Sequence, residues 1–96
     1  MIFDKRVEWD PQKNLKIQEE RGISFESIHA AIEAGHLLEV ILHTNPKYQH
    51  QKILVVDMNG YVVLVPFIED EKRVFLKTAF PSRKATKTYL TETRRI

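Results

Sequence analysis

Two apolar segments joined by Asn59-Gly60 constrain the fold of this chain most. Ile53–Val56 and Tyr61–Val65 are rich in β-branched residues, and Asn-Gly between two such segments is the strongest short-range signal of a β-hairpin. Both segments are apolar at consecutive positions, which is typical of strands covered on both faces. We therefore expect a central antiparallel hairpin, with helices on one face and partial cover on the other. Pro66 cannot donate to a strand ladder, so we expect the pairing to end or bulge there.

Three helices are predicted from residues that cap them. Asp10, Ser24 and Ser82 are favoured N-cap residues, and a proline after Asp10 is tolerated at the first helical position. Gly22 and Gly35 supply the left-handed conformation that ends a helix. The helices are expected over Pro11–Arg21, within residues 24–35, and from Arg83 to about Thr91.

Further strands are expected around Val7 and Trp9, over Leu37–Leu42, and over Val74–Thr78. The resulting order, β-α-α-β-β-β-β-α, predicts a single α+β domain over residues 1–96. Its two N-terminal helices should pack on a four-stranded or slightly larger antiparallel sheet, with a helix at the C-terminal end.

The composition excludes several kinds of site. The 96 residues include no cysteine, which rules out disulfides, thiolate metal sites and cysteine nucleophiles and is typical of a reducing compartment. The three glycines form no phosphate-binding motif, so we expect no cofactor. No segment approaches the ~18 apolar residues of a membrane span, and the N-terminal segment lacks the apolar stretch of a secretory signal. We therefore predict a cytoplasmic protein that does not enter a membrane.

The four histidines recur every seven residues, at His29, His36, His43 and His50. This spacing suggests a metal site, but Gly35 ends the predicted helix before His36. No cysteine or compact histidine pair completes a ligand set. We therefore predict no bound metal.

Charge is concentrated at the C-terminal end of the chain. The net charge is +2 overall, but residues 82–96 contain five Lys/Arg and one Asp/Glu, which gives +4. A basic end on a balanced body fits a polyanion or an acidic protein partner, and it equally fits a solvated helix face.

Several cations could meet at one anion site. His50 and Lys52 are two residues apart, so they share a face if both are extended. Lys77 lies within a predicted apolar strand, where a charge is costly unless that face meets water or a ligand. Arg83 and Lys84 begin the last helix, whose free N–H groups favour an anion. The plainer alternatives are solvent-facing lysines, an inert His50 and a salt bridge from Arg83 to a carboxylate.

Three blocks of sequence resemble the BrnT family of type II toxins. They read VEWDPQKN (7–14), RGISFE (21–26) and PSRKATK (81–87), and they occur in the family's order over nearly the whole chain. Two features depart from the family pattern: His43–Lys52 replaces an expected Gly-rich, Arg-containing stretch, and Lys77 stands where the family carries an arginine.

The resemblance implies a small bacterial ribonuclease toxin of RelE/ParE-like fold that inhibits translation. Such toxins are held inactive by a cognate antitoxin, typically a ribbon-helix-helix DNA-binding protein. Metal-free RNA cleavage needs a base, an acid and cations around the phosphate. The predicted catalytic residues are His50, Lys52, Lys77 and Arg83, and the predicted RNA-binding residues are Tyr48, Lys84, Lys87 and Tyr89.

Two alternatives remain beside the nuclease. In the first, the chain only docks a DNA-binding partner and takes part in regulation of its own operon, without catalysis. Direct DNA binding through the last helix is disfavoured, because the net charge is small and no helix-turn-helix spacing is present.

Overall fold

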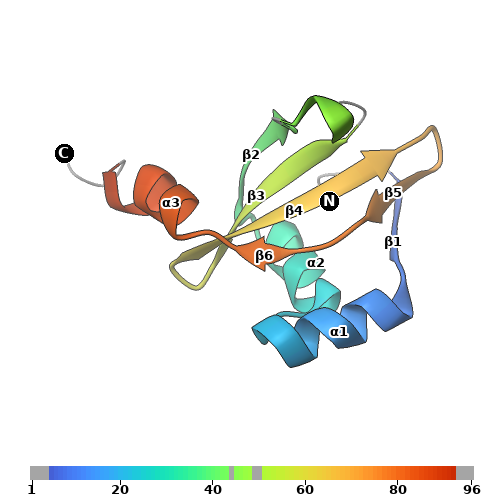
Figure 1. Cartoon of the computed structure of the whole chain (residues 1–96), viewed down its shortest axis with the longest axis horizontal. Helices are drawn as coiled ribbons and strands as arrows, with labels where there is room; N and C mark the ends of the chain where they lie inside the picture. Colours follow the sequence, from blue (N-terminus) through green and yellow to red (C-terminus); the bar gives the residue numbers. More distant parts are fainter. Residues whose placement is uncertain (1–4, 44, 49–50, 93–96) are drawn as a thin grey trace.

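The chain folds into one mixed sheet with two helices on one face and a helical segment at its C-terminal end (Figure 1). The computed structural model describes residues 5–43, 45–48 and 51–92. In chain order the elements are β1 (Arg6–Trp9), α1 (Pro11–Arg21), α2 (Phe25–Glu33), β2 (Leu37–Leu42), the 3₁₀ turn η1 (Pro46–Tyr48), β3 (Lys52–Met58), β4 (Tyr61–Glu69), β5 (Arg73–Leu76), β6 (Phe80–Pro81), α3 (Arg83–Thr86) and the π-helical η2 (Lys87–Glu92).

The predicted hairpin is confirmed and forms the centre of the sheet. The strand order is β1-β5-β4-β3-β2, and β6 also pairs with β4. Asn59 and Gly60 have φ values of 58° and 92° and connect the paired residues Met58 and Tyr61. The expected antiparallel sheet is wrong for one pair, because β1 runs parallel to β5. No tight turn joins these two strands, so their direction is not set by a hairpin.

The predicted helix starts are confirmed by their caps. The Asp10 side chain accepts the Gln12 N–H at 2.9 Å, and Ser82 Oγ accepts the Ala85 N–H at 3.0 Å. The last helix differs from the prediction, because it changes to π geometry after Thr86. The Thr86 hydroxyl donates to the Ser82 carbonyl at 2.7 Å and accepts the Val62 N–H at 2.8 Å. A hydroxyl bonded back to its own helix commonly distorts that helix.

Asn14 joins the first two helices. Its side-chain oxygen accepts the Phe25 N–H at 2.8 Å, and its side-chain amide donates to Glu26 at 2.7 Å. The latter bond lowers the pKa of Glu26 below its ordinary value. Asn14 is itself buried, so these bonds fix the relative position of α1 and α2 inside the protein.

We call the side of the sheet that α1 and α2 cover the helix face. Paired residues in neighbouring strands point to the same face, so the register assigns each strand residue to a side. The main core lies between the helix face and the two helices and consists of Ile17, Phe25, Ile28, Ile32, Leu54, Val56, Val63, Val65, Phe67, Val74, Leu76 and Ala79.

We call the opposite side the outer face, and it is covered only in part. Val55 and Val62 pack there against Leu90, with Ala85 and Tyr89 at the margin. This cover comes from α3 and η2, which lie toward the end of the sheet remote from β5 (Figure 1). The outer face around β5 therefore carries side chains that no helix of the described residues covers.

Candidate functional site

The outer face is interrupted opposite Pro66, and this interruption creates a cleft. β4 continues through Pro66 to Glu69, so the prediction that pairing ends at this proline is wrong on the β3 side, where Pro66 pairs with Ile53. On the other side, β5 ends at Leu76 and β6 begins only at Phe80. The Lys77 N–H donates to the Pro66 carbonyl at 2.8 Å, which places the missing N–H of Pro66 beside this gap. The proline therefore costs no ladder bond.

The cleft beside Pro66 has a volume of about 320 Å³. Six separate parts of the chain contribute to it: α1, the residue after β2, the residue before β3, β4, the β5–β6 connection and β6. The lining residues are Lys13, His43, Gln51, Pro66, Lys77, Thr78 and Phe80. Two lysines, a histidine, an amide and a hydroxyl thus meet with no carboxylate among the described residues of the lining. Such a set suits an anionic ligand.

His43 is held in one orientation at the rim of the cleft. Its Nδ1 accepts the Asn45 N–H at 3.2 Å, and its backbone N–H donates to the Gln51 carbonyl at 3.2 Å. A neutral imidazole that accepts at Nδ1 carries its proton on Nε2. Nε2–H is therefore a hydrogen-bond donor.

Lys77 is exposed, and its ammonium lies 5.6 Å from the centroid of the Phe75 ring. Among the described residues no carboxylate lies within ion-pair distance of it. An ammonium without such a partner is available to pair with an anionic ligand, because no ion pair has to be broken first.

Lys52 does not join Lys77, which corrects the expectation that the strands present them together. Lys52 pairs with Phe67, and Phe67 pairs with Leu76, so Lys52 shares the helix face with these two core residues. Lys77 follows Leu76 and points to the outer face. Lys52 instead contacts Glu69 at 3.4 Å.

Glu69 is the carboxylate that forms an ion pair with Lys52. It also binds Lys5 at 2.9 Å, and the Lys5 hydrogen bond is the main cause that lowers the Glu69 pKa, with Lys52 adding to it. Lys52 therefore has a structural partner where Lys77 has none.

Arg83 and Lys84 lie on the outer-face side at the start of α3, where both side chains are exposed. The alternative of a salt bridge from Arg83 is not seen among the described residues. The Ser82 N–H donates to the Val62 carbonyl, whereas the Lys77 N–H donates to Pro66. These anchors are four residues apart on β4, which corresponds to about 13 Å. Arg83 thus lies along the sheet from the cleft and does not line it.

Tyr89 does not line the cleft either. Its hydroxyl donates to the Glu39 carboxylate on β2, and this bond is the main cause that raises the Tyr89 pKa. Its ring packs at the margin of the outer-face cluster. Lys87 is exposed in η2. His50 and the side chain of Tyr48 lie outside the described residues.

Sequence reasoning missed Lys13 and Gln51 and set His43 aside with the other histidines. The sequence held a partial signal for two of them. His43 directly follows the predicted strand Leu37–Leu42, and Gln51 lies two residues before the predicted strand that begins at Ile53. Adjacent antiparallel strands bring such positions to one end of a sheet. The approach of α1 to this end is a tertiary contact that no local pattern indicates.

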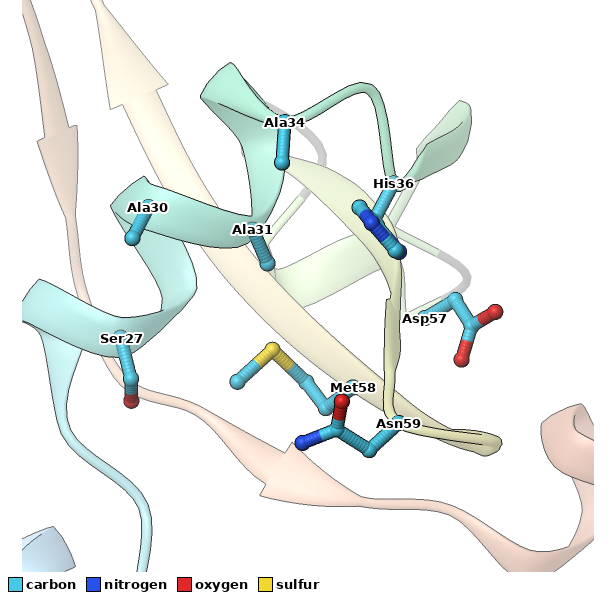
Figure 2. Close-up of a pocket in the computed structure, with 8 residues that line it drawn as sticks. All are labelled: Ser27, Ala30, Ala31, Ala34, His36, Asp57, Met58 and Asn59. Atoms are coloured by element: carbon cyan, nitrogen blue, oxygen red, sulfur yellow. The ribbon is translucent and has the colours of Figure 1, made fainter.

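A second cavity, of about 280 Å³, lies along α2 and has different chemistry (Figure 2). Three alanines, Met58 and Asn59 form much of its wall. His36 and Asp57 also line the cavity. The Asp57 carboxylate, however, accepts the Gly60 N–H at 2.7 Å and so stabilises the hairpin turn. This cavity has no convergent set of charged groups, so the cleft at Lys77 is the better candidate site.

The described part of the chain shows no cluster of three or more His, Asp or Glu side chains arranged to hold a metal ion. None of its helices is both long and apolar enough to cross a bilayer. Fold and cleft together define a small α+β protein with a cleft lined by two lysines and a histidine. No protein-family model, curated protein or solved structure gives a significant match to the chain.

Proposed function

We propose that the chain is a BrnT-like toxin of a type II toxin–antitoxin system, with a RelE/ParE-like fold, and that it cleaves RNA without a metal ion in the cytoplasm. The observation that carries this proposal is the cleft at Lys77, where Lys13, His43 and Lys77 converge without a carboxylate in the described lining. The PSRKATK block that resembles the family follows this cleft directly in the chain.

The chemistry assigns a role to each group. In metal-free cleavage the ribose 2′-oxygen attacks the adjacent phosphorus, the P–O5′ bond breaks, and a cyclic phosphate and a free 5′-hydroxyl form. Lys77 and Lys13 stabilise the charge that grows on the phosphate oxygens, and His43 Nε2–H donates to one of them. The proton shuttle predicted from the sequence is His50 or Lys52; His50 lies outside the described residues, and Lys52 contacts Glu69. The shuttle takes the proton of the 2′-hydroxyl and returns a proton to the leaving 5′-oxygen. Arg83, Lys84 and Lys87 contact neighbouring phosphates of the same strand.

The test is induction of the chain alone in a bacterial host, together with purified protein on unpaired RNA in the presence of a chelator. We expect arrested growth, inhibited translation and cut RNA with cyclic phosphate ends. A Lys77→Ala, Arg83→Ala double variant should lose both effects. Normal cleavage and arrest by that variant would dispose of these assignments.

A second candidate function is a non-catalytic module that docks a DNA-binding antitoxin and acts in operon autoregulation. The edge strand β2 favours it, because Leu38, Val40 and Leu42 are 40%, 43% and 70% exposed. An apolar strand at a sheet edge is a ready site for an added strand of a partner. If induction leaves growth and RNA unchanged while a neighbouring ribbon-helix-helix protein co-purifies, this reading replaces the nuclease.

A further inference from the structure

Phe75 lies on the outer face beside the cleft, between two cations. Arg73 Cζ is 5.4 Å and Lys77 Nζ is 5.6 Å from the centroid of the ring. Arg73 and Lys77 are two residues before and after Phe75, so all three side chains point to the same side of the sheet. The ring is partly exposed, and within residues 5–43, 45–48 and 51–92 no helix covers this part of the outer face (Figure 1).

The two cations are held differently. Arg73 Nη1 binds Glu8 at 3.0 Å, and Arg73 Nε lies 3.7 Å from Asp70, so its guanidinium is fixed from two sides. Lys77 has no such carboxylate in the described part of the chain, and its ammonium ends a flexible four-carbon stem. Lys77 can therefore leave the ring while Arg73 stays.

We infer that Phe75 is a stacking platform for one unpaired nucleobase, next to the phosphate held at Lys77. This inference rests on the proposed function and deepens it by naming the residue that binds the base. When the strand enters, the Lys77 ammonium moves from the ring to the phosphate, and the base takes its place on the ring. Stacking of a base on an aromatic ring is stronger than an exposed cation–π contact, so the exchange favours binding.

Charge around Phe75 sets the direction of the strand. The small hollow on one side of the ring is lined by Glu69 and Asp70 as well as Arg73, and carboxylates repel a phosphate backbone. On the other side lies Lys77, which also lines the cleft. The backbone therefore runs from Phe75 toward the cleft and away from the β4–β5 turn.

The platform selects unpaired strands. A base inside a duplex has both of its faces covered by neighbours, so it cannot lie on Phe75 without leaving the stack. Stacking is tolerant of sequence because every base has a π face. Phe75 thus contributes affinity for single strands with little preference among bases.

The experiment measures binding of a fluorescent, uncleavable 2′-deoxy oligonucleotide by anisotropy. Phe75→Leu removes the π face and keeps an apolar side chain, and we expect it to weaken binding about 5- to 50-fold. Phe75→Trp should retain affinity, and its added fluorescence should be quenched by the oligonucleotide. Tyr61→Leu is the matched control, because Tyr61 is 41% exposed but lies at the hairpin, paired with Met58 of the helix-face core margin. An oligonucleotide with an abasic position should bind wild type and Phe75→Leu more equally.

Each outcome is decisive. Wild-type affinity in Phe75→Leu, or an unquenched Phe75→Trp, overturns the platform and leaves cleavage at Lys77 standing. Absence of any binding by the wild type overturns both the platform and the proposed function. Intact oligonucleotide binding with loss of antitoxin co-purification assigns Phe75 to the protein partner and overturns the inference. If Phe75→Leu fails to fold, as judged by circular dichroism, the Phe75→Trp quenching decides alone.

Discussion

The two faces of the sheet differ in how much of their surface is buried. On the helix face, α1 and α2 bury a continuous core, and Asn14 fastens the helices to each other with two hydrogen bonds. On the outer face, only Val55, Val62 and Leu90 are buried in the cluster under α3 and η2. The first face secures the fold, so the second can carry exposed cations without loss of the core. Substitutions on the two faces should therefore change different measurements.

The largest effect is expected at Lys77 on the outer face, with Lys52 on the helix face as its control. Lys77→Ala should lower the rate of RNA cleavage about 10²- to 10³-fold, because the cation that stabilises the charge on the phosphate oxygens is lost. Lys52→Ala is the matched control, since it removes an equally exposed lysine that binds Glu69 on the helix-face side. We expect the control to cut within about threefold of wild type, because exposed ion pairs contribute little. Single-turnover cleavage assays make the comparison, and equal losses in both variants would contradict the assignment of function to one face.

The contrast between local signals and strand register shows which features the sequence could predict. The caps at Asp10, Ser24 and Ser82 and the Asn59-Gly60 turn are local, so they predicted the starts of the helices and the hairpin correctly. The face on which a lysine lies depends on register across three strands, which no local pattern specifies. Lys52 and Lys77 therefore looked equivalent in the sequence, although the sheet separates them.

At Pro66, too, a local property is visible in the sequence while its tertiary consequence is not. Its missing donor is a local property, but the expected break in the hairpin pairing is wrong, because Pro66 pairs with Ile53 of β3. Which neighbouring strand is interrupted depends on the tertiary arrangement, and the break falls on the side of β5 and β6 rather than β3. The cleft results from the interruption between β5 and β6, so its lining could not be predicted from the sequence.

The next largest effect should come from the helix face. Asn14→Ala leaves the buried Phe25 N–H without an acceptor, which costs about 2 kcal/mol of unfolding free energy. Urea denaturation followed by circular dichroism measures this loss. Lys16→Ala, an exposed substitution in the same helix, should change stability by less than about 0.5 kcal/mol. If Asn14→Ala is as stable as the control, the hydrogen bonds between α1 and α2 do not secure this face.

The smallest effect is expected at Tyr89, which ties the C-terminal segment to β2 on the outer face. The bond to Glu39 raises the Tyr89 pKa above its ordinary value of 10.0. The stabilisation is therefore fully present below pH 10 and is lost as the pH rises through the folded-state value. Because the pair is largely solvent-exposed, we expect Tyr89→Phe to lower the unfolding free energy by only about 0.5 kcal/mol at pH 8.

Above the folded-state pKa of Tyr89, the two proteins should converge in stability, since the wild type has then lost the same bond. Urea midpoints from pH 8 upward test this, and a constant difference between the proteins would show that Tyr89 acts by packing alone. Oligonucleotide binding by Tyr89→Phe should equal that of wild type, because the ring stays at the margin of the outer-face cluster. A marked loss of binding would instead show that the Tyr89 hydroxyl contacts the oligonucleotide, and it would extend the functional surface over the part of the outer face that η2 covers.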